Sequence, residues 1–247
     1  MLKNRMNTVN EAEIQNFSKD SDHWWDEQGP FKPLHLLNPT RLSYFKTQIC
    51  THFNLDKSTP KPYQDLDIID VGCGGGLVCE PMARLGGTVT GIDADANAID
   101  VATEHAKAMD LDISYQCKSS ENMTKQYDVV LALEIIEHVD NPELFVKSVI
   151  NLCKPNGLVI FSTLNRTPKS YALGIIAAEH ILRWVPQGTH NWKKFVKPSE
   201  LSRMLRAHGA TPSDICGMTY NPITKEFKLD KSRVDVNYFM SVEGTAA

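Results

Sequence analysis

The stretch Asp70-Val71-Gly72-Cys73-Gly74-Gly75-Gly76 decides the fold of this chain. It follows the apolar pair Ile68-Ile69 and precedes a helix-like segment, Leu77–Leu85. Glycines permit positive φ angles and let the backbone come close to a ligand, because they carry no side chain. The start of the following helix offers unpaired N–H groups to an anionic ligand group. The stretch therefore predicts a strand, a glycine turn and a helix that together form a nucleotide-binding corner.

The spacing of the glycines indicates which nucleotide binds there. A dinucleotide fingerprint requires G-x-G-x-x-G, whose third glycine packs the helix against the strand. Counted from Gly72 and Gly74, that third position holds Leu77, which disfavours an NAD-dependent oxidoreductase. Gly76 and the acidic Asp70 instead resemble the first motif of the Rossmann-like S-adenosylmethionine (SAM) methyltransferases.

A second carboxylate supports this interpretation. The run Thr88-Val89-Thr90-Gly91-Ile92-Asp93 has the pattern of a strand that ends in an acid. Asp93 stands about 20 residues after the glycine turn, where a doubly wound fold holds the ribose hydroxyls of an adenosine ligand. The alternative is a plain glycine turn followed by an Asp that caps a helix.

Composition favours a soluble enzyme that consists of one larger domain, or of a domain with extensions. The chain has 247 residues and a net charge of −4, so no global basic field argues for nucleic acid. Its six cysteines show no C-x-x-C or zinc-like spacing, which indicates reduced, mostly buried thiols in a cytosolic compartment. No uninterrupted apolar stretch reaches the roughly 18 residues of a membrane-spanning helix.

Apolar strands and amphipathic helices alternate after a polar linker at residues 56–64. This alternation predicts a parallel sheet with helices on both faces, whose ligands bind beyond the carboxyl ends of the strands. We predict an N-terminal helical extension at 1–55 that contributes to the SAM site, a core at 66–247, and a turn at Lys154-Pro155-Asn156-Gly157. The predicted strands are Leu66–Val71, Thr88–Ile92, Ile113–Cys117, Tyr127–Leu133, Leu158–Thr163, Asp214–Tyr220 and Asp235–Val242, and the predicted helices are Leu77–Leu85, Ala96–Met109, Pro142–Leu152 and Pro198–His208.

Three further stretches resemble the bacterial ubiquinone-biosynthesis O-methyltransferases and their mitochondrial relatives. The resemblance covers about Phe17 to Tyr238. It implies a Rossmann-like, doubly wound α/β fold with a seven-stranded sheet whose last strand is antiparallel and inserted beside the sixth. The stretches are Trp24-Trp25-Asp26 through Gly29-Pro30-Phe31-Lys32-Pro33-Leu34-His35 to Asn38-Pro39-Thr40-Arg41-Leu42, then Ser162-Thr163-Leu164-Asn165-Arg166 with Gly188-Thr189-His190, and Tyr220-Asn221-Pro222-Ile223-Thr224 with Asp235-Val236-Asn237-Tyr238.

The resemblance implies SAM-dependent methylation of phenolic oxygens on polyprenylated rings, namely a 2-polyprenyl-6-hydroxyphenol and 3-demethylubiquinol. It implies SAM contacts at Arg41, Gly72, Asp93 and Leu133, with Gly74 in the same loop. Arg41 offers a planar fork that matches the methionine carboxylate, and its alternative is a surface arginine after a turn. Leu133 stands where the family commonly has Met, a change that keeps volume and apolarity, and its alternative is ordinary strand-end core.

The expected chemistry requires a phenolate, because a phenol with a pKa near ~10 is a poor nucleophile until it loses its proton. Glu134, Glu137 and His138 follow the predicted fourth strand, and their spacing places them on one face if a helical turn begins there. A general base, with His138 the strongest candidate, or a divalent cation held by the three would supply the phenolate. Mitochondrial relatives are credited with Mg²⁺ at a matching Glu-x-x-Glu-His group. The alternative is a turn with acids that a helix dipole favours.

An apolar segment between Ser170 and Val185 has few charges, contains Trp184 and has basic flanks. It predicts either an anchor on anionic lipid or a lid over the active site, within an interfacial segment around 166–197. We therefore expect a cytoplasmic protein, peripherally bound to the inner face of the membrane. Its expected partners are a polyprenylated phenol or quinol, the membrane surface and a quinone-biosynthesis enzyme complex, but not nucleic acid.

Two other functions stay open at this point. The chain could be a SAM-dependent methyltransferase of another small phenolic or carboxylic acceptor, or a non-catalytic SAM-binding accessory protein of a quinone-synthesis complex. Consumption of SAM with a demethylated quinol would separate these hypotheses from the leading one.

Overall fold

One central sheet of eight strands organises the protein, in a computed structural model that describes residues 8–172 and 191–244. Its strands are β1 (Asp67–Val71), β2 (Thr88–Asp93), β3 (Ile113–Cys117), β4 (Tyr127–Leu133), β5 (Cys153–Leu164), β6 (Pro212–Asn221), β7 (Glu226–Asp230) and β8 (Asn237–Glu243). The helices are α1 (Glu11–Ser18), α2 (Lys32–His52), α3 (Cys79–Arg84), α4 (Ala96–Ala108), α5 (Pro142–Asn151), α6 (Pro168–Ser170) and α7 (Pro198–Ala207), with short 3₁₀ turns η1 (Ser21–His23), η2 (Ser120–Asn122) and η4 (Trp192–Lys194).

The strand order is β3-β2-β1-β4-β5-β8-β6-β7, and the pairs among β1 to β5 are all parallel. β8 runs antiparallel between β5 and β6, which confirms a doubly wound sheet with an antiparallel strand beside the sixth. The sheet has one strand more than the predicted seven, because β7 forms a hairpin with β6. The sequence of β7 is Glu-Phe-Lys-Leu-Asp, and such charged side chains are typical of an edge strand. Because β7 contains no apolar run, the sequence pattern did not predict it.

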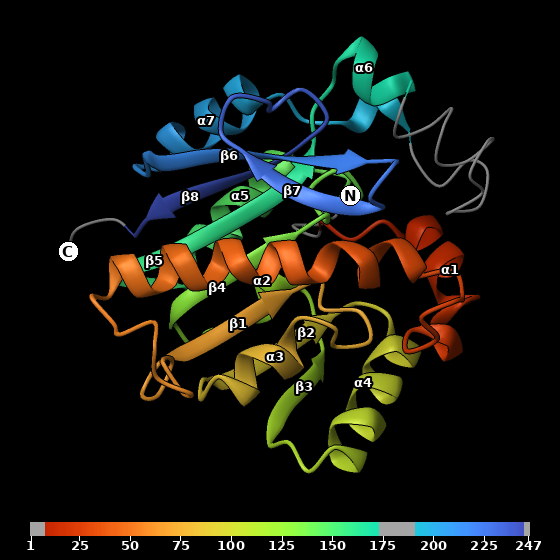
Figure 1. Ribbon diagram of the computed structural model, residues 1–247, viewed down its shortest axis with the longest axis vertical. Helices are drawn as coiled ribbons and strands as arrows, with labels where there is room; N and C mark the ends of the chain where they lie inside the picture. Colours follow the sequence, from red (N-terminus) through yellow and green to blue (C-terminus); the bar gives the residue numbers. More distant parts are fainter. Residues whose placement is uncertain (1–7, 173–190, 245–247) are drawn as a thin grey trace, which may run out of the picture.

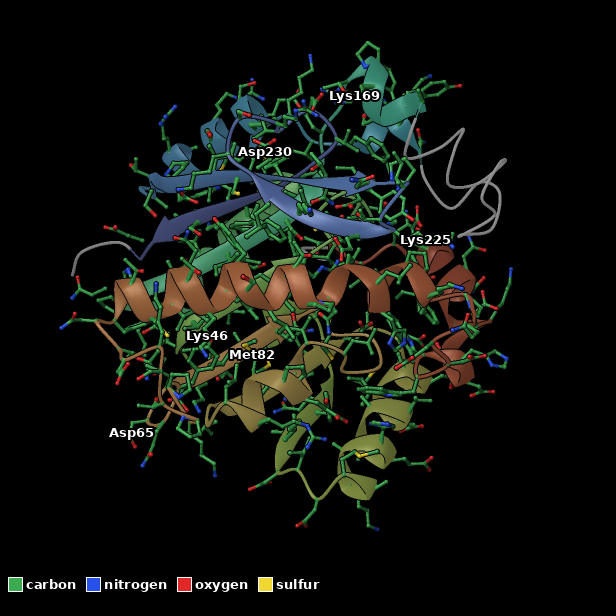
Figure 2. The ribbon with its side chains drawn as sticks, in the orientation of Figure 1. Lys46, Asp65, Met82, Lys169, Lys225 and Asp230 are labelled. Atoms are coloured by element: carbon green, nitrogen blue, oxygen red, sulfur yellow. The ribbon has the colours of Figure 1, made fainter. Side chains whose placement is uncertain are left out.

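Helices cover both faces of the sheet, as predicted. α2, α3 and α4 bury apolar side chains against one face, and α5 and α7 bury theirs against the other. Figure 1 shows α2 crossing the front of the sheet, with α5 behind it. Side chains fill the space between these layers, Met82 of α3 among them (Figure 2).

The predicted turn at residues 154–157 is wrong, because this segment lies inside β5. Tyr127 pairs with Cys153 and Val129 pairs with Leu158, so the four residues between them bulge opposite Asp128 alone. Asn156 has a φ of 60°, the left-handed conformation that an Asn-Gly sequence favours. A β-bulge absorbs such a residue without ending the strand.

The N-terminal extension is helical, as expected, and α2 belongs to the main core. Tyr44, Phe45 and Ile49 are buried, and the ring of Tyr44 stacks on Phe239 of β8 at 4.6 Å. This packing holds α2 across the sheet and sets the position of Arg41, one turn before Tyr44. The glycine-rich turn is longer than expected, so α3 begins at Cys79 rather than at the predicted Leu77.

The predicted membrane-contacting segment falls mostly on residues 173–190, which lie outside the described residues. Along the two stretches of chain that are described, none of the helices combines the length and the apolar character needed to cross a bilayer.

Candidate active site

The glycine loop after β1 adopts a backbone that only glycines accept easily. Gly72, Gly74 and Gly76 have φ angles of 77°, 51° and 88°. A Cβ atom at Gly74 would lie 2.3 Å from the ring of Trp24, and one at Gly76 would lie 2.3 Å from the Tyr115 hydroxyl. The glycines are therefore required both by conformation and by the close approach of neighbouring side chains.

Asp93 lies against this loop, at the end of β2. Its Oδ2 accepts a hydrogen bond from the Gly74 N–H at 2.9 Å, and its Oδ1 accepts one from the Asp95 N–H at 2.9 Å. Burial raises the pKa of Asp93, although these backbone bonds oppose the change. Each carboxylate oxygen has a second acceptor site, so Asp93 keeps the capacity to accept ribose hydroxyls.

Arg41 is a buried arginine, only 4% exposed, rather than the surface residue of the alternative interpretation. Its Nη2 lies 3.8 Å from Glu134 Oε1, and its Nε and Nη2 are buried without a hydrogen-bond partner in the described chain. Burial lowers the pKa of Arg41, whereas the charges of Glu134, Asp70 and Glu137 raise it. A buried fork with unused donors fits a ligand carboxylate.

Asp70, the acid that precedes the glycines, faces Arg41 from β1. Burial raises its pKa to about 7, although the charge of Arg41 opposes the shift. Its Oδ2 accepts a weak hydrogen bond from the Cys79 thiol at 3.6 Å, and its Oδ1 has no partner among the described residues. A carboxyl group with such a shifted pKa and a spare acceptor atom is typical of a functional site.

Buried polar atoms without a partner gather in this corner. Nine such side-chain atoms occur within the described residues, and seven of them lie beside the glycine loop or the Glu134 side chain. Native proteins leave few such groups unpaired unless a ligand, an ion or water completes them. The seven atoms belong to Trp24, Asn38, Arg41 (two atoms), Asp70, Tyr115 and Asn237.

Glu134 follows β4 with a φ of 51°, a left-handed conformation that is uncommon outside glycine. Its carboxylate accepts hydrogen bonds from Ser162 Oγ at 2.7 Å and from Asn237 Nδ2 at 3.0 Å. These two bonds, from β5 and β8, hold the acid beside Arg41. Leu133, immediately before Glu134, is buried at the end of β4, and its role in shielding the ligand stays a prediction.

Glu137 and His138 occupy the turn that follows. Glu137 is 4% exposed, and its Oε2 accepts a hydrogen bond from Thr163 Oγ1 at 2.8 Å. Burial, reinforced by the charge of Glu134, raises the pKa of Glu137 to about 7. Burial lowers the pKa of His138, but a hydrogen bond to Glu13 and the nearby carboxylates outweigh burial, so the net change is upward.

These three side chains do not form a ready metal site. Each has a separate partner: Glu134 is held by β5 and β8, Glu137 by Thr163, and His138 by Glu13. Across residues 8–172 and 191–244, no group of three or more His, Cys, Asp or Glu side chains is placed to hold a metal ion. The arrangement therefore does not fit the expected three-ligand Mg²⁺ site, and the metal role stays a prediction.

The N-terminal extension contacts the glycine loop and α4. The sequence predicted only that residues 1–55 contribute to the SAM site, without naming these contacts. Trp25 Nε1 donates to the Gly75 carbonyl at 3.0 Å, and the Trp25 ring stacks on His105 at 3.5 Å. Ser21 Oγ donates to Asp95 Oδ2 at 2.7 Å. None of these contacts could be predicted from sequence spacing, because each joins residues at least 50 positions apart.

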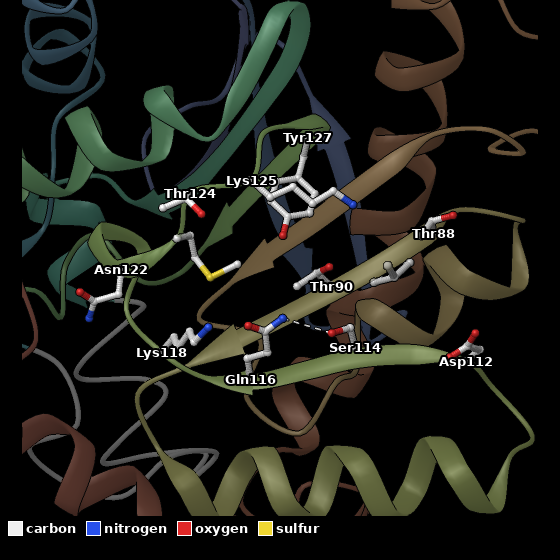
Figure 3. A pocket seen from close by; sticks show the side chains of 12 residues that line it. Thr88, Thr90, Asp112, Ser114, Gln116, Lys118, Asn122, Thr124, Lys125 and Tyr127 are labelled. Atoms are coloured by element: carbon white, nitrogen blue, oxygen red, sulfur yellow. Dashed lines mark hydrogen bonds between the residues drawn. The ribbon is translucent and has the colours of Figure 1, made fainter.

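Hollows lined by described residues also occur outside this corner. A groove of about 470 Å³ runs over β2 and β3, lined by hydroxyl, amide and lysine side chains such as Thr90, Gln116 and Lys118 (Figure 3). A second hollow of about 540 Å³ is lined on one side by Glu137 and on the others by α7 and the segment around Phe195. The second one adjoins the turn that carries Glu137 and His138.

Comparison with known proteins agrees with this geometry. A family model described as a methyltransferase domain matches residues 43–213. The ubiquinone biosynthesis O-methyltransferase of Bartonella tribocorum is 45% identical over 243 residues, which cover 97% of this chain and 98% of that protein. The protein of the same name from Brucella anthropi is 44% identical over 249 residues and covers 100% of both chains.

Solved structures with little sequence identity share the fold. The magnesium protoporphyrin IX methyltransferase of Synechocystis, solved with bound SAM, has a TM-score of 0.64 at 15% identity and covers 97% of this chain and 100% of its own. A SAM-dependent methyltransferase from Aquifex aeolicus has a TM-score of 0.58 at 14% identity, with 88% and 99% covered. At such identities the likeness establishes the fold and nothing more.

Proposed function

The chain belongs to the ubiquinone biosynthesis O-methyltransferases, and we propose that it transfers the methyl group of SAM to phenolic hydroxyls of polyprenylated rings. The acceptors are a 2-polyprenyl-6-hydroxyphenol and 3-demethylubiquinol. One observation carries this proposal. Proteins of that name match this chain over nearly its full length, and the glycine loop, Asp93 and Arg41 of this chain lie together in one corner of the fold.

SAM fits the described residues of this corner. Gly72 and Gly74 let the backbone approach the ligand, and Asp93 accepts the ribose hydroxyls. Arg41 receives the methionine carboxylate, because its Nε and Nη2 are buried donors that need an acceptor. Leu133 supplies apolar contact at the end of β4.

The turn after β4 supplies the proton chemistry. The sulfonium of SAM already activates the methyl group, so the enzyme must position a phenolate in line with it. We assign the role of general base to His138, whose imidazole can take the phenolic proton. The phenolate oxygen then bonds to the methyl carbon while the carbon–sulfur bond breaks, which leaves S-adenosylhomocysteine and the methyl ether. Glu134 and Glu137 fix the turn and set the charge around it.

A direct assay tests this function. Purified protein is incubated with SAM and a demethylated quinol, and S-adenosylhomocysteine and the methylated quinol are quantified by mass spectrometry. Equal amounts of both products support the proposal. A protein that binds SAM yet yields neither product would instead be the accessory protein, and activity only on unrelated phenols or carboxylic acids would indicate another acceptor.

The role of a metal is tested in the same assay. Because Glu134, Glu137 and His138 are not placed to hold one metal ion together, we expect activity to persist in EDTA. We expect it to fall in His138→Ala. Loss of activity in EDTA, with recovery on adding Mg²⁺, would instead support the cation that the family resemblance suggested.

We further propose contact with anionic membranes through the apolar segment 170–185 and its basic flanks. The support is its composition in the sequence together with an acceptor whose prenyl tail resides in lipid. The protein should float with anionic liposomes, less so in high salt, and the double variant Ile176→Ser with Trp184→Ser should float poorly. Unchanged flotation of the double variant would remove the anchor role. Loss of activity on a short, water-soluble catechol as well as on a long-tailed quinol would indicate a lid.

A further inference from the structure

One end of the Asn38 amide, on α2, contacts the turn between the glycine loop and α3. Its Nδ2 donates a hydrogen bond to the Leu77 carbonyl at 2.8 Å. A carbonyl can only accept a hydrogen bond, so this contact determines which amide atom faces the turn. The other atom, Oδ1, is buried and has no hydrogen-bond partner among the described residues. The side chain is therefore held in one orientation, and its buried acceptor is available to a ligand.

Arg41 stands three positions later on the same helix and presents the opposite kind of atom. Residues three apart are neighbours on the surface of a helix, so Asn38 and Arg41 share one face of α2. Asn38 contacts the end of the glycine-rich turn, and Arg41 faces Asp70, the acid at its start. The Nε and Nη2 atoms of Arg41 are buried donors without a partner in the described part of the chain. One helix face thus offers unused donors beside an unused acceptor.

This combination matches the chemistry of an α-amino acid group. Such a group carries a carboxylate and an ammonium on one carbon, and the carboxylate accepts hydrogen bonds whereas the ammonium donates them. The planar fork of Arg41 fits the carboxylate. The ammonium then requires an acceptor close by, because a buried polar group that stays unpaired costs binding free energy. Asn38 Oδ1 is such an acceptor, and the acids that surround Arg41 also favour a cation here.

We propose that Asn38 is a specificity-determining residue of the SAM site, and that its Oδ1 accepts a hydrogen bond from the α-ammonium of SAM. Its bond to Leu77 keeps the amide from turning over, so the donor end does not face the ammonium. The site accordingly distinguishes SAM and S-adenosylhomocysteine (SAH) from adenosine compounds that lack the amino group. This inference rests on the proposed function, which places the methionine carboxylate on Arg41.

The experiment uses calorimetry to measure how the wild type and Asn38→Leu bind two ligands. One ligand is SAH, and the other is its desamino analogue, which keeps the adenosine, the thioether and the carboxylate. The wild type should bind SAH at least about tenfold more tightly than the analogue, because hydrogen bonds to charged groups are among the stronger ones. Asn38→Leu has a side chain of similar size without an acceptor. Its preference for SAH should fall to about twofold or less, mainly through weaker binding of SAH.

Further variants separate recognition of the ammonium from support of the turn. Asn151→Leu changes an exposed amide at the end of α5 and should leave both dissociation constants unchanged. Asn38→Asp also loses the donor to Leu77 but keeps an acceptor, so it should keep the preference for SAH that Asn38→Leu loses. Asn38→Ala removes the acceptor without adding bulk, and it replaces Asn38→Leu if that variant does not fold.

A preference for SAH that persists in the folded Asn38→Leu or Asn38→Ala variant would overturn the inference. Equal losses for both ligands would mean that Asn38 only fixes the turn through Leu77, and no loss would mean that another acceptor, such as Asp70 Oδ1, binds the ammonium. A wild type without any preference for SAH contradicts the inference as well. A wild type that binds neither ligand would instead contradict the SAM site of the proposed function, so the two failures are distinguishable.

Discussion

Asp67 and Asp70 lie toward opposite ends of β1, and their surroundings differ. Asp67 is at the amino edge, where the parallel strands begin, and Asp70 is at the carboxyl edge, where they end. At the amino edge, Asp67 accepts hydrogen bonds from Lys125 at 2.9 Å and Lys154 at 3.1 Å, and these bonds lower its pKa. At the carboxyl edge, Asp70 is buried with an unpartnered Oδ1, and burial raises its pKa to about 7.

The difference extends beyond one strand. At the amino edge, Lys154 also bonds Asp128, so acids and lysines form a paired and partly exposed network. At the carboxyl edge, Arg41 faces three acids with two of its donors unused, and Glu134 keeps a left-handed backbone. One edge satisfies its charges within the protein, whereas the other holds unsatisfied groups and strain where a ligand is expected.

Removing Arg41 should disturb the carboxyl edge most. Arg41→Ala leaves Asp70, Glu134 and Glu137 facing one another, and breaking a buried pair of this kind costs about 3–5 kcal/mol. We expect a matching loss in the free energy of unfolding, measured with urea, and no detectable SAM binding. Lys46→Ala, on the same helix, should change stability by less than about 0.5 kcal/mol. Equal effects of the two variants would contradict the comparison.

Asp93→Asn should weaken SAM binding with little loss of stability. The amide keeps one acceptor for the Gly74 or Asp95 N–H but loses the charge that strengthens bonds to ribose hydroxyls, which is worth about 1.5–3 kcal/mol. Calorimetry should show an affinity at least about tenfold lower. Asp100→Asn, on the exposed side of α4, serves as the control, and a folded Asp93→Asn with wild-type affinity would remove Asp93 from the site.

Asp70 should make stability fall as pH rises. Its pKa is about 7 in the folded protein and about 3.9 in an unfolded chain, so between these values the folded state binds a proton that the unfolded state lacks. Stability from this group is therefore fully present below about pH 4 and is lost by about 1.4 kcal/mol per pH unit up to pH 7. Urea unfolding of ligand-free protein at pH 5, 6 and 7 should show a flatter profile in Asp70→Asn. Parallel profiles would mean that Asp70 is charged throughout.

The smallest effect is expected at the amino edge. Lys154→Ala removes bonds to Asp67 and Asp128, but the lysine is more than a third exposed, so we expect a loss of about 1 kcal/mol or less. The loss should shrink in high salt, because solvent-exposed pairs are screened. SAM affinity should stay at the wild-type value. A large, salt-independent loss would show that this edge is not the simple paired network described above.

The sequence alone determined the parts of the protein that depend on short spacing. Alternating strands and helices predicted the doubly wound sheet, and the glycines after β1 predicted a loop with positive φ angles. The spacing of about 20 residues also predicted Asp93 at the end of β2, where its carboxylate accepts a hydrogen bond from the Gly74 N–H, and its role toward ribose stays a prediction. The same local reasoning failed at residues 154–157 and at β7, because a bulge and an edge strand are defined by their partner strands rather than by their own residues.

Tertiary structure decided how the candidate site is completed. The sequence predicted Glu134, Glu137 and His138 close together, and packing gives each of them its own hydrogen-bond partner. The burial of Arg41 follows from the way α2 crosses the sheet, and the bond between Glu13 and His138 follows from the way α1 docks beside Asp140. Contacts across more than 100 residues leave no periodic signal in the sequence, because they are set by the docking of whole elements that bury apolar surface.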